Sequence, residues 1–245
     1  MVIEELNEFE ILQGVLSLTI SLIGLIIGLI IIIRYFEHRR KELLGVGLAI
    51  ILTTISWMAS GISFLSLLFY GVLLDETLYL FIAYGFTLSA ALCMMYAIIS
   101  LLYPKPAIKI ILIFLIVTIV FEIIFVYLLL TNIEAVGTIA GKFDSESRGI
   151  STLMVLTALV TALIVRILLI REFSKSENKK LQWRGRFILV EFILLIIGVI
   201  MDAILSLTVP TLILARILLV LRLIFVYLGW LLPDRVAKWL IKTEE

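Results

Sequence analysis

Long apolar runs separated by short charged segments dominate the chain. The first three runs, 11–33, 43–74 and 77–104, contain no charged residue, and the later runs contain one or two each. A helix needs roughly 20 apolar residues to cross the hydrocarbon core of a bilayer. The pattern therefore predicts seven membrane-spanning helices, over approximately 10–34, 43–69, 78–102, 107–131, 150–171, 187–209 and 211–232.

The basic residues alternate between the connections. The segments 34–42, 103–109 and 171–186 and the C-terminal tail together hold 15 Lys and Arg, whereas the intervening segments hold only Lys142 and Arg148. Because basic loops stay in the cytoplasm, this alternation predicts an external N-terminus and a cytoplasmic C-terminus. We expect an all-α seven-helix bundle (1–232) in the plasma membrane, followed by a short cytoplasmic amphipathic tail (233–245).

Composition and flanking charges agree with this architecture. Hydrophobic residues make up 63% of the chain and charged residues 16%, against about 45–50% and 25% in soluble domains. Acidic residues precede the first helix and basic residues follow it, which is the reverse of a signal peptide. The net charge of +1 argues against a nucleic-acid partner.

The tail and the basic loops predict contacts on the cytoplasmic side. Val236, Trp239 and Leu240 have helical spacing, so the tail is expected to lie on the bilayer surface, the alternative being a frayed terminus. Anionic lipids or a cytoplasmic signalling partner are expected to contact a set of mostly basic residues: Arg39, Arg40, Lys179, Lys180, Arg184, Arg186 and Trp239.

Small residues line one face of the helix over 10–34. They recur at intervals of three or four, a spacing that allows another helix to approach closely: Gly14, Ser17, Ser21, Gly24 and Gly28. This stripe predicts either packing within the chain or an interface of a homo-oligomer.

Polar residues of the next two helices form a second stripe. It predicts either a polar cavity or hydrogen bonds between helices, and its members are Thr53, Ser56, Trp57, Ser60, Ser63, Tyr84 and Tyr96. The four prolines all fall at predicted helix ends, so no interrupted span is expected, which weighs against transporters built on broken helices.

Six ionisable residues fall at membrane depth, where a charge needs a partner and predicts a functional site: Glu122, Asp202, Arg216, Arg222, Glu191 and Arg166. The short turn at Pro210 predicts an antiparallel hairpin in which Asp202 meets Arg216, with Glu122 at the same depth.

The other three ionisable residues are two arginines and one glutamate, so one arginine has no carboxylate of its own. Arg166 and Glu191 stand at similar depth and predict a second ion pair. Arg222 has no obvious partner at its depth, and we expect it to point into the bundle toward Glu191, Tyr or Ser side chains, or water.

Three functions are compatible with these charges: a purely structural subunit, a proton or ion channel or transporter that uses them as a relay, and a sensor. No catalytic residue, metal or cofactor is expected, because the only histidine, His38, lies in a basic loop and the only cysteine, Cys93, in an apolar run. The helix over 211–232 has no lysine for a retinal Schiff base.

The sensor hypothesis comes with a family resemblance. The seven-helix layout, the "SWMASG" stretch at 56–61 and the closing "YLGWLLPDRVAKW" at 227–239 resemble the seven-helix membrane sensory domains of prokaryotic histidine kinases. That resemblance implies a receptor-like domain that feeds a cytoplasmic output module. The printed chain carries no kinase module, so the output would be a separate partner.

Overall fold

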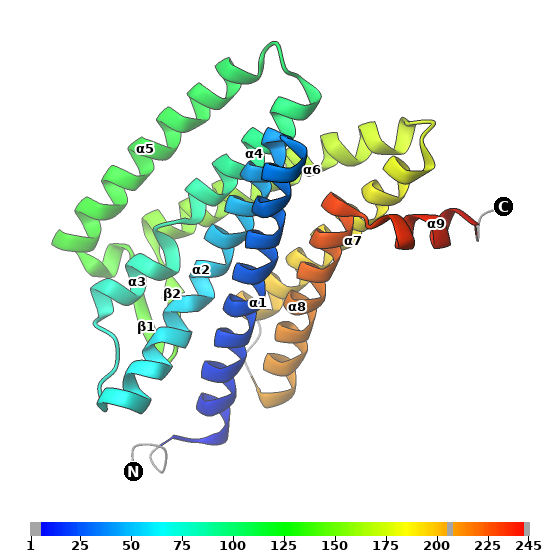
Figure 1. Ribbon diagram of the computed structural model, residues 1–245. Helices are drawn as coiled ribbons and strands as arrows, with labels where there is room; N and C mark the ends of the chain where they lie inside the picture. Colours follow the sequence, from blue (N-terminus) through cyan, green and yellow to red (C-terminus); the bar gives the residue numbers. More distant parts are fainter. Residues whose placement is uncertain (1–5, 205–207, 243–245) are drawn as a thin grey trace.

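The computed structural model describes residues 6–204 and 208–242, and they are almost entirely helical (Figure 1). The elements in chain order are α1 (Glu8–His38), α2 (Lys41–Tyr70), α3 (Glu76–Tyr84), α4 (Thr87–Leu102), α5 (Ala107–Thr131), a 3-10 turn (Ile133–Ala135), β1 (Gly137–Gly141), β2 (Asp144–Ser147), α6 (Gly149–Lys175), α7 (Lys179–Ile204), α8 (Val209–Leu231) and α9 (Asp234–Lys242).

The structure confirms an all-α protein of membrane type. By length and composition six helices could cross a membrane: α1, α2, α3 together with α4, α5, α6 and α8. Within the described residues α7 is not one of the six, so the number seven and the orientation stay predictions. The prediction that α7 begins near residue 187 is wrong, because the helix starts at Lys179.

The third predicted helix is interrupted, although it contains no proline. α3 ends at Tyr84 and α4 begins at Thr87, with Phe86 in the bridge region at φ −108° and ψ 2°. A Cβ at Gly85 would lie 2.6 Å from the Phe81 carbonyl oxygen, so the absent side chain permits this close approach. The expectation of uninterrupted spans is therefore wrong at this position.

The long helices form a closed ring. α1 packs on α2, α2 on α4, α4 on α6, α6 on α7, α7 on α8, and α8 returns to α1. Side chains from all six of these helices meet in one apolar core, among them Ile31, Ile50, Ile98, Leu169, Ile188 and Leu223. α5 lies outside the ring, at the upper left of Figure 1, against α3, α4 and α6.

Small residues bring α1 and α2 together. A Cβ at Gly24 would lie 2.2 Å from the Thr54 side chain, and one at Gly14 would lie 2.3 Å from Phe64. Ser17 and Ser21 of the same stripe are also buried. The stripe therefore packs within the chain and is not available as an oligomer interface. A homo-oligomer through another surface stays a prediction.

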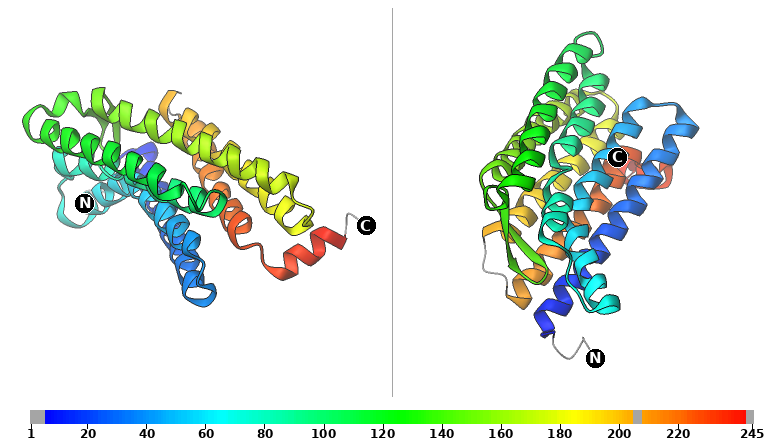
Figure 2. Two further views of the ribbon diagram at one scale, coloured as in Figure 1. Left: turned by 90° about the horizontal axis from the view of Figure 1, so that it is seen from above. Right: turned by 90° about the vertical axis from the view of Figure 1, so that its left-hand side faces the viewer.

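A two-stranded hairpin that the sequence did not predict covers one end of the bundle, which we call the hairpin end (Figure 2, right). β1 and β2 pair in antiparallel fashion within the predicted 132–149 loop. Phe143 at the turn is buried in edge-to-face contact with Phe64 of α2, and Lys142 Nζ lies 3.3 Å from Glu10 Oε2 of α1. These contacts attach the hairpin to the start of α1 and the end of α2.

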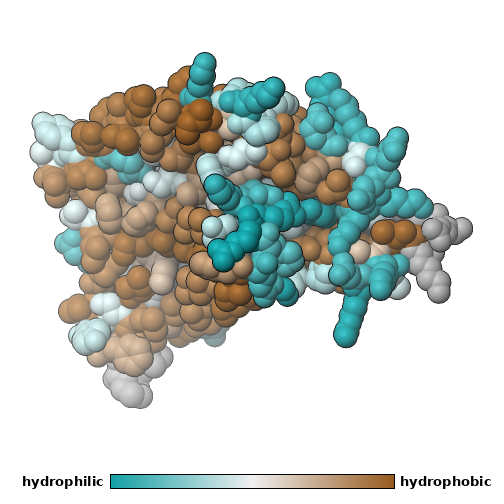
Figure 3. Space-filling model, turned by 45° about the horizontal axis from the view of Figure 1, so that its top comes forward, coloured by the Kyte–Doolittle hydropathy of each residue, from teal (hydrophilic) through white to brown (hydrophobic). Residues whose placement is uncertain are grey.

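The opposite end, which we call the basic end, carries the α1–α2, α4–α5 and α6–α7 connections and α9. In Figure 3 hydrophilic residues gather at the top and right of the molecule, whereas its left flank is largely hydrophobic. Large apolar side chains on the flanks, such as Ile113 of α5 and Ile164 of α6, are more than half exposed. Such a surface is typical of a protein surrounded by lipid.

Candidate functional site

Three charged side chains meet inside the ring and form the candidate site. Arg166 comes from the middle of α6, Glu191 from the middle of α7 and Arg222 from the middle of α8. Their exposed fractions are 5%, 2% and 3%. We call these residues the Arg–Glu–Arg cluster.

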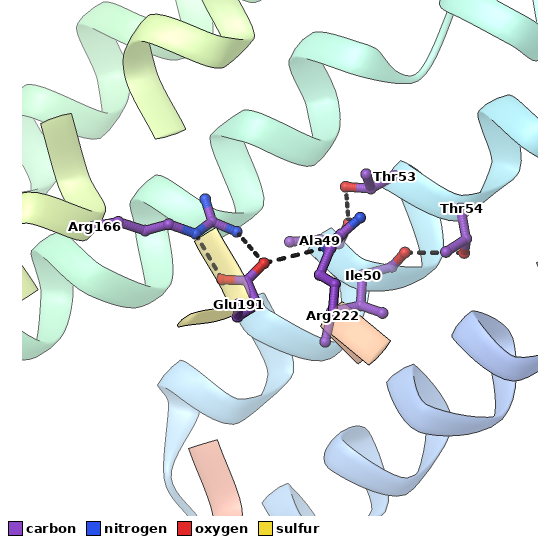
Figure 4. A network of polar contacts seen from close by, with 7 residues as sticks. All are labelled: Ala49, Ile50, Thr53, Thr54, Arg166, Glu191 and Arg222. Atoms are coloured by element: carbon purple, nitrogen blue, oxygen red, sulfur yellow. Dashed lines mark hydrogen bonds and ion pairs between the residues drawn. The ribbon is translucent and has the colours of Figure 1, made fainter. Parts of the chain in front are cut away.

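Glu191 lies between the two guanidinium groups (Figure 4). Arg166 donates through Nε to Oε2 at 3.1 Å and through Nη2 to Oε1 at 3.3 Å, and Arg222 Nε donates to Oε1 at 3.2 Å. The Arg166 guanidinium also lies 5.3 Å from the centre of the Phe192 ring. One carboxylate thus joins three neighbouring helices of the ring.

The charges of the cluster do not cancel. Two guanidinium groups surround one carboxylate, so the group carries a net positive charge in a place where water is scarce. Removing one partner from a buried ion pair typically costs about 3–5 kcal/mol, because the remaining charge stays buried without compensation. The packing of α6, α7 and α8 therefore depends on the Glu191 carboxylate staying between the two guanidinium groups.

The structure answers two sequence predictions about these charges. The Arg166–Glu191 pair is confirmed, and of the partners considered for Arg222 the structure selects Glu191. The Asp202 side chain lies outside the described part, so its pairing with Arg216 stays a prediction.

Arg216 and Glu122 do not belong to the cluster. Arg216 is buried six residues before Arg222 on α8, about 9 Å along the helix axis, where it lines an apolar groove of about 190 Å³ between α1 and α8. Glu122 is on α5, which packs on α3, α4 and α6, whereas α8 packs on α1 and α7. A relay through all six predicted residues stays a prediction, because the Asp202 side chain lies outside the described part.

Most hydroxyl groups predicted for a polar cavity are used in hydrogen bonds. Thr53 donates to the Ala49 carbonyl at 2.6 Å, Ser60 Oγ lies 2.8 Å from Tyr79 Oη, and the Tyr84 hydroxyl donates to the Ser145 carbonyl. Ser63 Oγ accepts the backbone N–H of Leu74. This arrangement agrees with the packing alternative, and a wet cavity along α2 stays a prediction.

The remaining members of that stripe lie apart from these hydrogen bonds. Ser56 is half-buried on α2, and Trp57 packs in the apolar cluster around Ile20 and Leu219. Tyr96 of α4 lines a groove beside the α1–α2 connection.

Arg184 has a role that the sequence did not suggest. It was predicted to contact lipid or a partner, but it is buried at the start of α7, where Nε and Nη2 donate to the carbonyl oxygens of Gly229 and Trp230, each at 2.9 Å. The last turn of α8 has no basic residue of its own, so Arg184 satisfies carbonyl groups that the helix leaves without partners. The antiparallel arrangement of α7 and α8 was the signal that could have indicated this contact.

The tail helix packs partly on protein. Ala237 and Leu240 of α9 are buried beside Trp183 and Phe187 of α7, and Lys180 Nζ lies 2.7 Å from Asp234 Oδ1. Trp239 is 67% exposed on another face of the helix. The prediction that Leu240 and Trp239 lie together on the bilayer is therefore wrong for Leu240.

The other residues predicted for the cytoplasmic surface stay accessible. Arg39 and Lys179 are exposed, and Arg40 is half-buried. Arg186 is exposed with its guanidinium 4.4 Å from the centre of the Trp183 ring. His38, which was predicted to lie in a loop, is instead the last residue of α1, where its Nδ1 lies 3.1 Å from the Arg34 carbonyl oxygen one turn earlier.

Comparison with known proteins adds no assignment: no family model and no curated protein matches this chain. Within the described residues, no group of three or more His, Cys, Asp or Glu is placed to hold a metal ion. What the site can do therefore follows from its own chemistry, which is that of buried, coupled charges.

Proposed function

We propose that this chain is a receptor-like seven-helix membrane sensor, with its N-terminus outside, in which the Arg–Glu–Arg cluster couples an external or intramembrane signal to the cytoplasmic face. The observation that carries the proposal is Glu191, a single carboxylate held by arginines of two other helices. A protonation, displacement or ligand that weakens one of these bonds changes how α7 packs between α6 and α8.

The same helix reaches the proposed output surface. Lys180, Trp183 and Phe187 lie about one to three turns before Glu191 on α7 and contact α9. Because a helix moves largely as a rigid rod, a shift of α7 at Glu191 displaces α9 as well. The partner would dock on the exposed parts of the 171–186 segment and the tail, in agreement with the resemblance to histidine-kinase sensory domains.

The coupling is tested by measuring the distance between spin labels on Arg171→Cys of α6 and Lys238→Cys of α9, in a Cys93→Ser background in nanodiscs. Glu191→Gln should shift or broaden the distance distribution, because the cluster loses its negative charge. Glu172→Gln, which removes an exposed carboxylate of α6, is the matched control and should leave the distribution unchanged. Identical distributions for both variants would overturn the coupling.

The orientation is tested on intact cells with a membrane-impermeant maleimide. A cysteine at Glu134, in the connection after α5, should be labelled, and a cysteine at Lys105, in the α4–α5 connection, should be labelled only after permeabilisation. The reverse pattern would overturn the external N-terminus.

A transporter is the second candidate, favoured by the interruption between Tyr84 and Thr87 and by Glu122, which is half-buried with Oε1 lacking a hydrogen-bond partner in the described part. Glu191 lines neither the groove between α1 and α8 nor the groove beside the α1–α2 connection, so we rank transport second. Proton flux into liposomes that falls with both Glu191→Gln and Glu122→Gln would support transport in place of sensing.

A further inference from the structure

A groove of about 570 Å³ opens at the basic end, between the α1–α2 connection and the start of α5. Three consecutive cations, Arg39, Arg40 and Lys41, line one side of it. The hydroxyl-bearing residues Tyr96 and Ser100 of α4 line another. The groove is separate from the Arg–Glu–Arg cluster, and nothing in the proposed sensing mechanism uses it.

The groove carries an excess of positive charge. Arg40 is paired with Glu42, whose Oε1 lies 2.6 Å from Arg40 Nη2. Arg39 and Lys41 have no carboxylate partner among residues 6–204 and 208–242, and Glu42 is the only acidic residue in the lining. Two positive charges therefore remain for a ligand.

The hydroxyl groups of the groove are also available. In the described structure, neither Tyr96 Oη nor Ser100 Oγ makes a hydrogen bond to another residue. Guanidinium, ammonium and hydroxyl groups facing one space are the donors that bind a phosphate group.

An apolar surface continues from the groove along α5. Ile108 lines the groove, and Leu112 and Ile116 follow it at intervals of four residues on the same helix face. Their exposed fractions are 62%, 48% and 62%. A ligand with a phosphate head in the groove could thus lay an apolar chain on α5.

From this combination of cations, free hydroxyl groups and a continuous apolar face, we propose that the groove binds the headgroup of an anionic phospholipid, with an acyl chain along Ile108, Leu112 and Ile116. The basic end lies where the positive-inside rule places the anionic leaflet. A lipid in this position would brace α5, the helix outside the ring, against the α1–α2 connection.

The backbone suggests variants that preserve the fold. Arg39 ends α1 in the left-handed region at φ 54°, with its N–H donated to the Tyr35 carbonyl at 2.7 Å. Asn tolerates this conformation better than most residues, so Arg39→Asn with Lys41→Gln removes both unpaired charges without straining the turn. Arg171→Gln with Lys175→Gln is the matched control, because it removes two exposed cations from the same end of the bundle at α6.

The test titrates the purified full chain, in a neutral detergent, with phosphatidic acid, with phosphatidylcholine of the same chains and with inorganic phosphate, and counts bound lipid by native mass spectrometry. Each basic residue near an anionic lipid contributes about fivefold in affinity, so the Arg39→Asn/Lys41→Gln variant should bind phosphatidic acid about 30-fold more weakly. The control should stay within about threefold of the wild type, and phosphatidylcholine should bind weakly to all forms.

Three results would overturn the proposal: equal binding of both lipids, equal loss in the groove variant and the control, or displacement of the lipid by millimolar inorganic phosphate alone, which would make the site one for a soluble anion. If the double variant does not fold, Tyr96→Phe with Ser100→Ala replaces it, with an expected loss of about fivefold from two hydrogen bonds. Unchanged affinity in that variant would equally count against the site.

Discussion

Two groups of neighbouring helices in the ring, α1 with α2 and α6 with α7 and α8, are held together by different means. α1 and α2 meet through glycines and serines, and their contact contains no ion pair in the described structure. α6, α7 and α8 meet around three buried charges. Helices in lipid must associate with little hydrophobic driving force. The first contact achieves this by complementary shape and the second by opposite charges. Of the two contacts, only the second contains charged groups, so a change of charge acts on it directly.

The largest effect is expected from Glu191→Gln. The amide leaves Arg166 and Arg222 as two buried cations without a countercharge, which should lower the free energy of unfolding by about 3–5 kcal/mol. Thermal unfolding in nanodiscs measures it, with Glu172→Gln as the exposed control. The triple variant Arg166→Met/Glu191→Leu/Arg222→Leu should recover most of this stability, because it leaves no buried charge. If the triple variant loses as much unfolding free energy as Glu191→Gln, the charges themselves stabilise the fold.

A smaller effect is expected in the shape-dependent contact. Gly24→Val places side-chain atoms where Thr54 now lies, and overpacking of this kind typically costs about 1–3 kcal/mol. The same thermal unfolding measurement applies. Val at Gly141, where a Cβ would meet nothing within 4 Å, is the control. Equal melting temperatures for the two valine variants would mean that α1 and α2 separate easily.

Ser21→Ala should change stability less. Its hydroxyl donates to the Ser17 carbonyl at 2.9 Å and lies 3.4 Å from the Thr54 carbonyl of α2, so only a long hydrogen bond joins the helices. The expected loss is about 0.6 kcal/mol, the average for such bonds in membranes. A loss as large as that of Gly24→Val would indicate that polar bonding contributes as much as shape to this contact.

The smallest expected effect is the pH dependence of the contact between Lys180 of α7 and Asp234 of α9. The hydrogen bond from Lys180 lowers the pKa of Asp234 below its ordinary value, which is about 3.9. Because the folded-state pKa is the lower one, the contact contributes fully above the ordinary value and is lost as the pH falls through the lowered pKa. The distance between labels at 171 and 238 should therefore be constant from pH 7 to 5 and change only in more acidic solution. Asp234→Asn should abolish that change, and a transition that persists in it would have another origin.

The membrane-spanning helices were predictable, because the features that define each of them lie within its own stretch of sequence. In the described residues each predicted range contains a helix, interrupted within 78–102, and α5 has the predicted bounds 107–131, because apolar length and flanking charges are local properties. The interruption at Gly85 and Phe86 escaped prediction since no proline accompanies it. The hairpin at 137–147 escaped because its strands are short and contain few alternating apolar residues.

The candidate site was predictable only in part. Position along the predicted spans placed Arg166 and Glu191 at similar predicted depth and so paired them, whereas Arg222 had several possible partners. Arg184 was misplaced, because the sequence shows a basic residue in a basic loop but not the carbonyl groups of Gly229 and Trp230 beside it.

By itself the sequence determined the apolar helices, the alternation of basic loops and the depth of each charge, since these follow from spacing along one helix. The tertiary structure decided which helices are neighbours. It set α5 with Glu122 outside the ring, selected Glu191 among the partners expected for Arg222, and turned the small residues of α1 toward α2. The expected depth of a residue follows from its position along one helix. Its contact partner depends on how all the helices pack together.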